Sequence, residues 1–405
     1  MSAQDRGLLP TLRGLLGVSL GVSCFGLANG GNFAVYAVEI SAAGGGEGLV
    51  GLSTSIYFLG TLTASLTFAP LVSRLGHVRA FALFATLAFG STAALAFVPW
   101  VQAWPALRCV TGLGIGGFYL VMESWFNYAA ENRHRGRVYA FYETVRLSSV
   151  AIGSALLLGL NQAFGASVFL ATAALYLAAL LPVGMSHARQ PRPETTGAMP
   201  VTTLLRLAPL GMACCFVGGL TTAAIYGLVP LYGEQAGLDT GWLAALVFVS
   251  HFGAFVLQIP MGALSDRLGR RPAILLVSAL CSVLALATGL ADNLDLPLLL
   301  LAGMLVGGVC HTVYMLGTVI TNDRLDPASL VRGAAVLLVA YDVGTVIGPY
   351  PAALAMQAFG RGGLYLFIAG LMFALALLAA VPIATIRRSN PERCRVPCPN
   401  CPPGA

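Results

Sequence analysis

The sequence predicts an all-α integral membrane protein in which twelve transmembrane helices form two six-helix repeats. Three observations support this fold class. Of the 405 residues, 57% are hydrophobic and 9% are charged, whereas about 25% of residues are charged in an ordinary soluble domain. The mean hydropathy is +0.82. Long apolar segments follow one another along the chain, and one long polar segment divides them into two equal sets.

The membrane spans follow from length and polarity. A bilayer core of about 30 Å requires roughly 20 apolar residues per helix. Twelve segments meet this requirement, at residues 14–38, 49–71, 80–98, 105–129, 138–160, 166–184, 207–231, 241–262, 273–291, 297–321, 334–358 and 363–386.

Arginine sets the predicted orientation, because the chain contains no lysine. With the N-terminus in the cytoplasm, all of the 22 arginines except Arg108, Arg146 and Arg361 fall on the cytoplasmic side. Such an excess of basic residues is typical of cytoplasmic loops. We therefore expect a bacterial inner-membrane protein with both termini in the cytoplasm. The absence of lysine also excludes a Walker A loop, so ATP-driven pumping by this chain alone is not expected.

The polar segment at residues 186–206 is rich in proline and threonine, which is typical of an extended linker. We therefore divide the chain into an N-terminal half at 1–185, a cytoplasmic linker at 186–206, a C-terminal half at 207–386 and a cytoplasmic tail at 387–405. The tail contains three cysteines, of which Cys398 and Cys401 form a C-x-x-C pair and Cys394 is the third, but no fourth ligand is nearby, so we expect no metal. Two parallel six-helix repeats joined by a linker are a transporter architecture.

The halves also share a charged loop after their second helix. In the C-terminal half it reads GALSDRLGRR at residues 262–271, and in the N-terminal half APLVSRLGHVR at residues 69–79. Ser73 stands where the later copy has Asp266. Two glycines, Gly262 and Gly269, are expected to allow a tight turn in the later loop.

These residues resemble the major facilitator superfamily over essentially the whole chain. The later loop matches the signature Gly-x-x-x-Asp-Arg-x-Gly-Arg-Arg at Gly262, Asp266, Arg267, Gly269, Arg270 and Arg271. The earlier loop resembles a second copy at Arg74 and Gly76 that lacks its acid. Residues 108–112 resemble the helix 4 pattern Arg-x-x-x-Gly. The runs ESWFN at 123–127 and RGRVYAFYE at 135–143 resemble a bacterial branch of the superfamily, the YcaD-like transporters.

The resemblance implies the major facilitator fold, in which helices 1, 4, 7 and 10 line a central cavity with support from 2, 5, 8 and 11. It also implies that Asp266 faces the inner end of helix 5 and helps to close the cytoplasmic side. The loop with Ser73 in the equivalent position is expected to stabilise this closure less. Drug antiporters of the superfamily carry Gly-x-x-x-Gly-Pro in helix 5. The corresponding residues 148–157 lack this pattern, which weakens drug export as an interpretation.

Polar residues within the predicted spans are candidates for a substrate or proton pathway, because a charge at the centre of a membrane span costs about 2.5 to 3.5 kcal/mol on insertion scales. In helix 1 the candidates are two amides that could hydrogen-bond a polar substrate. The others lie on helices 4, 5, 8, 10 and 11, and none lies on helices 3, 6, 9 or 12. The full set is Asn29, Asn32, Arg108, Glu123, Glu143, Arg146, His251, His311 and Asp342.

Several interpretations of these candidates stay open. Glu123, Glu143 and Arg146 could form one ion cluster that either takes up protons or remains a permanent structural network. A pair between His311 and Asp342 is feasible across neighbouring helices. Arg108 lies near the outer end of its span, so its side chain either reaches the outer interface or is buried in a gating or relay role.

We expect a secondary active transporter that moves a small solute by alternating access, coupled to protons, and acts as a monomer. One alternative is an uncoupled or exchange carrier of an anionic metabolite, which would be bound through Arg146 and Arg108. Another is a non-transporting membrane scaffold with a transporter fold. We expect no enzymatic activity, no cofactor and no nucleic-acid partner.

Overall fold

The computed structural model describes residues 15–129, 135–185, 199–291, 293–326 and 329–381, and in these residues the chain is helical without strands. The helices of the N-terminal half are α2 (Leu16–Ala42), α3 (Glu47–Thr67), α4 (Ala69–Leu75), α5 (His77–Leu95), α6 (Trp104–Ala129), α7 (Arg135–Phe164), α8 (Val168–Ala178) and α9 (Leu180–Gly184). Those that follow are α10 (Val201–Leu207), α11 (Pro209–Gln235), α12 (Thr240–Leu268), α13 (Arg270–Leu290), α14 (Leu296–Asn322), α15 (Leu330–Ile347), α16 (Pro349–Phe359) and α17 (Gly363–Ala380).

These helices confirm the predicted fold class of twelve membrane crossings. Eleven apolar helical stretches are long enough to span a bilayer, and one of them, the 44-residue stretch Phe141–Gly184, contains both α7 and α8. Transmembrane helices 1 to 12 are therefore α2, α3, α5, α6, α7, α8, α11, α12, α13, α14, α15 and α17. Helices form here because a segment within lipid must satisfy its backbone hydrogen bonds internally.

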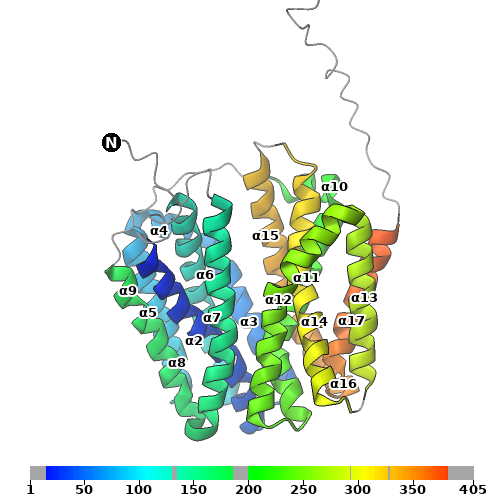
Figure 1. Ribbon diagram of the computed structural model, residues 1–405. Helices are drawn as coiled ribbons and strands as arrows, with labels where there is room; N and C mark the ends of the chain where they lie inside the picture. The colour runs from blue at the N-terminus through cyan, green and yellow to red at the C-terminus, as the bar shows by residue number, and fades with distance from the viewer. Residues whose placement is uncertain (1–14, 130–134, 186–198, 292, 327–328, 382–405) are drawn as a thin grey trace, which may run out of the picture.

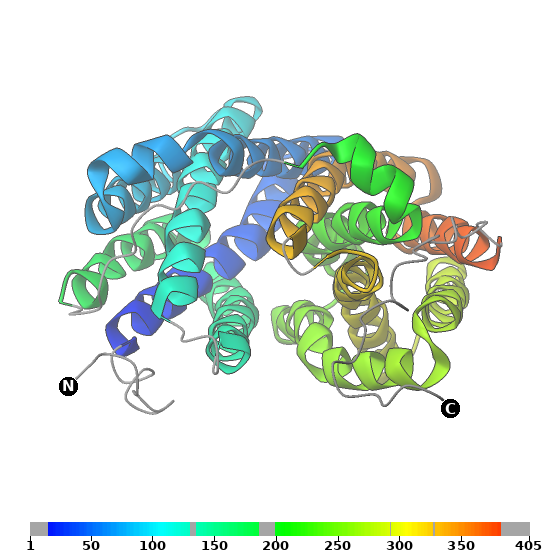
Figure 2. The same ribbon diagram turned by 90° about the horizontal axis from the view of Figure 1, so that it is seen from above.

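The helices pack as two bundles that lie side by side (Figure 2). Within the first bundle α2 packs on α7 and α3 on α6, and within the second α12 packs on α14 and α11 on α15. The bundles meet where α7 contacts α12 and where α3 contacts α15 and α16. Helices α5, α8, α13 and α17 lie at the flanks.

We call the end of the molecule that carries the loops at Gly76 and Gly269 the motif end, and the opposite end the far end. At the far end two hydrogen bonds join the halves: Ser41 Oγ donates to Glu234 Oε1 at 3.1 Å, and Gln235 Nε2 donates to Glu47 Oε1 at 2.7 Å. In Figure 1 the bundles approach each other at the far end and stand apart at the motif end.

Two glycines shape the motif end. Gly76 has a φ of 79° between α4 and α5, and Gly269 has a φ of 88° between α12 and α13. Side chains with a Cβ atom rarely adopt this region, so glycine is required for the sharp turn at each site. Each turn leads directly into the third membrane helix of its half. The expectation that Gly262 also takes part in the turn was wrong, because Gly262 lies within α12 and has no positive φ.

Candidate functional site

An ion pair lies at the centre of α7. Arg146 Nη2 donates to Glu143 Oε2 at 2.6 Å, and the guanidinium Nε lies 3.2 Å from the same oxygen. The two residues are three positions apart, so both side chains project from one face of the helix. Each side chain is 24% exposed. The Arg146 guanidinium carbon also lies 5.7 Å from the ring centroid of Tyr119 on α6. The pair is thus stabilised by the neighbouring helix and remains within reach of solvent.

Two further carboxylates lie near this pair but on different halves. Glu123 on α6 is within electrostatic range of Glu143, Arg146 and Asp342. Asp342 lies on α15 and is half-buried. Among the described residues, no direct ion pair joins Glu123 or Asp342 to a cation. The structure therefore brings together Glu123, Glu143 and Arg146 as the sequence suggested, and it adds Asp342 from the other half.

His251 and His311 form a second polar group on the C-terminal half. His251 Nδ1 lies 2.7 Å from the Val247 carbonyl, and His311 Nδ1 lies 3.0 Å from the Gly307 carbonyl. Because a carbonyl only accepts, both Nδ1 atoms carry the proton and a neutral ring presents its Nε2 as an acceptor. Both Nε2 atoms are buried without a partner among the described residues.

Ring contacts place these histidines against each other and against one tyrosine. Their ring centroids are 6.2 Å apart, and the Tyr226 ring on α11 lies 4.3 Å from His251 and 5.4 Å from His311. The suggested pair of His311 with Asp342 is not formed in the described residues. The reason is that the helix carbonyl one turn earlier holds the His311 ring, which packs on Tyr226 instead.

Arg108 lies in an aromatic box formed by Phe33 and Tyr36 on α2 and Tyr57 on α3. Its guanidinium carbon is 4.7, 4.5 and 4.6 Å from the three ring centroids. The residue is 0% exposed, and its Nε, Nη1 and Nη2 atoms have no hydrogen-bond partner in the described part of the chain. The side chain is therefore buried and does not reach the outer interface.

The energetics of this arrangement are unusual. Arginine remains charged in proteins, and the desolvation penalty of an uncompensated buried ion is several kcal/mol. A cation–π contact offsets about 0.5 to 2 kcal/mol, so the three rings of the box compensate for part of the penalty. Arg108 is consequently held as a cation that lacks an anionic partner.

The two amides of α2 connect neighbouring helices of the N-terminal half. Tyr57 donates its hydroxyl to Asn29 Oδ1 at 2.9 Å. Asn32 Nδ2 donates to Thr92 Oγ1 at 3.2 Å and to the Tyr176 hydroxyl at 3.5 Å. Asn32 Oδ1 is buried without a partner among the described residues. Asn29 therefore positions a ring of the aromatic box, and Asn32 connects α2 to α5 and α8.

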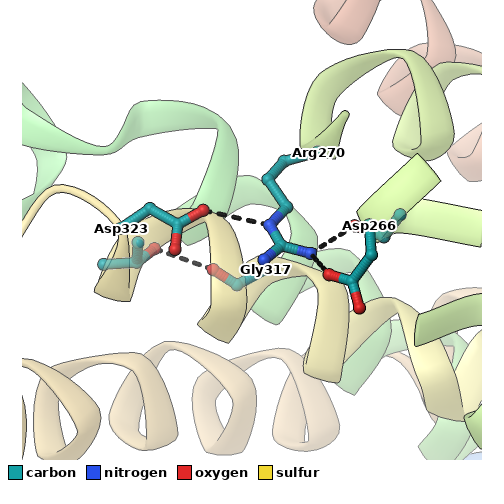
Figure 3. A network of polar contacts seen from close by, with 6 residues as sticks. Asp266, Arg270, Gly317 and Asp323 are labelled. Carbon is teal, nitrogen blue, oxygen red and sulfur yellow. Dashed lines mark hydrogen bonds and ion pairs between the residues drawn. The ribbon is translucent and has the colours of Figure 1, made fainter. Parts of the chain in front are cut away.

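The charged loop of the C-terminal half forms a compact network at the motif end (Figure 3). Arg270 lies between two carboxylates: its Nη1 donates to Asp266, and its Nε donates at 3.0 Å to Asp323, the residue that follows α14. Arg271 Nε donates to the Ala379 carbonyl on α17 at 2.7 Å, while Arg267 is exposed. The observed bonds of Asp266 thus stay within its own half. Side chains at residues 135–137 of α7, where the family pattern would direct Asp266, lie outside the described residues.

The corresponding loop of the N-terminal half uses other residues for the same connection. His77 follows Gly76 as Arg270 follows Gly269, and its Nε2 lies 2.5 Å from Ser124 Oγ on α6. The imidazole also lies 5.9 Å from the Trp125 ring. Ser73 only donates to the Pro70 carbonyl at 2.7 Å, and Arg74 is exposed. A histidine therefore joins the third and fourth helices here, in place of an arginine that would need the lost acid.

Comparison with known proteins decides the family. The model of the Major Facilitator Superfamily matches residues 18–257 and 239–394. The chain belongs to the major facilitator superfamily. Within it, the chain is 28% identical over 335 residues to the MFS-type transporter YcaD of Escherichia coli O45:K1, which covers 81% of this chain and 85% of the relative.

Solved transporters of the superfamily share the fold at low identity. The nucleoside transporter NupG has a TM-score of 0.70 at 13% identity, with 90% of this chain and 98% of that chain covered. A D-xylose-proton symporter has a TM-score of 0.70 at 14% identity, with 90% and 97% covered. A bacterial homologue of the lysosomal transporter Spinster, in an inward-facing and unoccupied conformation, has a TM-score of 0.69 at 13% identity, with 93% and 96% covered.

In this member of the superfamily, tyrosines make up much of the site that sequence reasoning missed. Tyr119, Tyr226 and Tyr341 come from three helices, and Arg146 is within electrostatic range of all three. No motif distinguishes such tyrosines from aromatic residues that only pack within a span. Tyr119 lies one turn before Glu123 and Tyr341 directly precedes Asp342, but no charged residue lies within a turn of Tyr226.

Proposed function

We propose that this secondary transporter moves a small polar solute by proton-coupled alternating access, as a monomer in the bacterial inner membrane with both termini in the cytoplasm. Membership of the major facilitator superfamily supports secondary transport. One arrangement supports the proton coupling: Glu123 on the N-terminal half and Asp342 on the C-terminal half both lack a bonded cation in the described residues, and Glu123 is within electrostatic range of Asp342 and of the Glu143–Arg146 pair.

The three carboxylates differ in whether a neighbouring cation already neutralises their charge. Glu143 already has Arg146 as its counter-charge at 2.6 Å. Glu123 and Asp342 have no bonded cation in the described structure, and an ionised carboxylate within a membrane span is costly. Binding a proton removes that cost and the mutual repulsion. Because the two acids belong to different halves, their repulsion changes when the halves move, which is what coupling requires.

The solute site that we propose lies between α6 and α7 on one side and α11, α12 and α14 on the other. The Tyr226 ring contacts both histidines, and their unpartnered Nε2 atoms offer acceptors to a solute with hydroxyl or amine donors. Arg146 and Tyr119 face this group from the N-terminal half. The similar solved structures include a nucleoside transporter and a D-xylose-proton symporter, and both kinds of solute bear hydroxyl donors.

The test is solute-driven proton movement in proteoliposomes. A solute is first found by its effect on the melting temperature of the purified protein, since a ligand that binds the folded state stabilises it. Addition of that solute should then change the internal pH of liposomes containing the wild type. Asp342→Asn should abolish the change, whereas Asp295→Asn, in an exposed far-end loop, should not. Solute uptake without proton movement at any pH would refute the coupling.

One observation favours a second function, the carriage or exchange of an organic anion without protons. Arg108 is a buried cation with no carboxylate near it in the described residues. An exchanger would show solute counterflow that is insensitive to Asp342→Asn. The same liposomes distinguish the two functions, because only the proton-coupled transporter changes the internal pH.

A further inference from the structure

The aromatic box of Arg108, Phe33, Tyr36 and Tyr57 has no role in the proton pathway. The groups that act electrostatically on Arg108 are Tyr36, Tyr57 and Tyr176, and no described carboxylate is among them. The guanidinium cannot lose its charge, and none of its three nitrogen atoms has a partner in the described structure. We therefore expect this buried cation to meet an anion at some stage of the transport cycle.

Two further hydroxyl donors lie near the guanidinium. The hydroxyls of Tyr36 and Ser53 are buried within reach of each other, and neither is bonded to another group in the described residues. Ser53 interacts with Tyr36, and it lies one helical turn before Tyr57 on α3. Guanidinium and hydroxyl groups are the donors that carboxylate oxygens accept from most strongly, and the guanidinium edge matches a planar carboxylate in a bidentate pair.

We propose that the Arg108 box binds the carboxylate group of a small organic acid when the far end of the transporter is open. The rings cover the guanidinium carbon at 4.5 to 4.7 Å. The three guanidinium nitrogens have no hydrogen-bond partner in the described residues, so their N–H groups are the donors that a carboxylate would use. The inference rests on the proposed transport cycle, and it names the chemical class of a solute or co-substrate that the chain accepts.

Closure of the far end explains why the box is sealed in this conformation. Phe33 contacts Arg108 on one side and lies 5.4 Å from the Tyr226 ring of the other half. The hydrogen bonds of Ser41 with Glu234 and of Gln235 with Glu47 hold the halves together at this end. Separation of the halves removes Tyr226 from Phe33 and opens a path to the box. While the far end is closed, the three aromatic rings stabilise the Arg108 cation in place of an anion.

Equilibrium binding to the purified full-length protein tests the proposal. Sodium acetate and sodium benzoate are titrated at constant ionic strength against sodium chloride and sodium sulfate, and the melting temperature is recorded. The carboxylates should raise it in a saturable manner, and chloride and sulfate should not. Arg108→Gln should lose the response. Arg79→Gln, which removes an exposed arginine at the motif end, should retain it.

Two further variants keep the test decisive if Arg108→Gln does not fold. Tyr36→Phe retains the ring and removes one donor to the anion, so the acetate dissociation constant should rise by roughly tenfold. The double variant Ser41→Ala with Gln235→Ala removes both far-end donors and populates the open state. Because a ligand specific for one state binds in proportion to its population, carboxylate affinity should increase severalfold.

The proposal is overturned if carboxylates stabilise the wild type no more than chloride or sulfate. It is also overturned if Arg108→Gln, or Tyr36→Phe in its place, responds as the wild type does. These binding measurements require neither transport nor a proton gradient. Absence of carboxylate binding with intact proton-coupled uptake therefore refutes this inference alone, and binding without proton movement refutes the coupling alone.

Discussion

Arg146 Nη2 lies 2.6 Å from Glu143 Oε2 of the same helix, and this pair is within electrostatic range of Glu123 on one half and of Tyr226 and Tyr341 on the other. The pair is neutral as a whole. In the proposed transport cycle, protonation of Glu123 and Asp342 would therefore set the net charge that a solute meets.

Breaking the central pair should destabilise the protein. Arg146→Gln leaves Glu143 without its counter-charge, and the loss should be about 1 to 3 kcal/mol, below that of a fully buried pair because each side chain is 24% exposed. The double variant Glu143→Gln with Arg146→Gln should recover part of it. A double-mutant cycle on melting temperature measures the coupling. Strict additivity of the two single effects would show that the pair contributes nothing.

The two charged loops should respond differently to restoration of the missing acid. Ser73→Asp alone should not raise the melting temperature, because position 77 holds His77, which bonds Ser124 on α6. Ser73→Asp with His77→Arg should rebuild the pair seen between Asp266 and Arg270 and be more stable than Ser73→Asp. Equal melting temperatures of the single and double variants would contradict this account.

Arg270 should matter more than Asp266 for the motif end. Asp266 has a side chain that is 67% exposed, so Asp266→Asn should cost about 0.5 to 1 kcal/mol. Arg270→Gln loses both Asp266 and Asp323 and should cost about twice as much. Labelling rates of a cysteine introduced at the exposed Arg74 position report whether either change also shifts the conformational balance. A larger loss of stability in Asp266→Asn than in Arg270→Gln would contradict this prediction.

The histidine acceptors should contribute to solute affinity. Asparagine in place of histidine retains a donor for the helix carbonyl but removes the Nε2 acceptor. His251→Asn and His311→Asn should each raise the dissociation constant of a donor-bearing solute about tenfold. Titration of melting temperature with the solute measures this. Unchanged affinity in both variants would remove the histidines from the solute site.

The sequence predicted the fold well because the bilayer imposes a strong constraint. Twelve apolar segments of sufficient length, divided by one polar linker and carrying a repeated charged loop, predict two six-helix bundles. The observed helices confirm this fold class. Side-chain partners were less predictable. The ring of His311 turns toward His251 and Tyr226 rather than Asp342, because a backbone carbonyl one turn away fixes its orientation. Spacing along a helix does not encode such a choice.

The depth of Arg108 was also undetermined by sequence. Its position near the start of α6 is compatible with a snorkelling side chain. Burial depends on Phe33, Tyr36 and Tyr57, which come from two other helices and converge only in the folded bundle. The replacement of an arginine by His77 in the earlier loop was visible in the sequence, but its partner Ser124 was not.

The internal pH of proteoliposomes during solute addition tests the central claim most directly. If Glu123 and Asp342 couple transport to protons, solute addition changes the internal pH of liposomes that contain the wild type. Both Glu123→Gln and Asp342→Asn should lose this change, while Asp295→Asn should behave as the wild type. Solute uptake that proceeds in all four proteins with no change in internal pH would contradict proton coupling through these two acids.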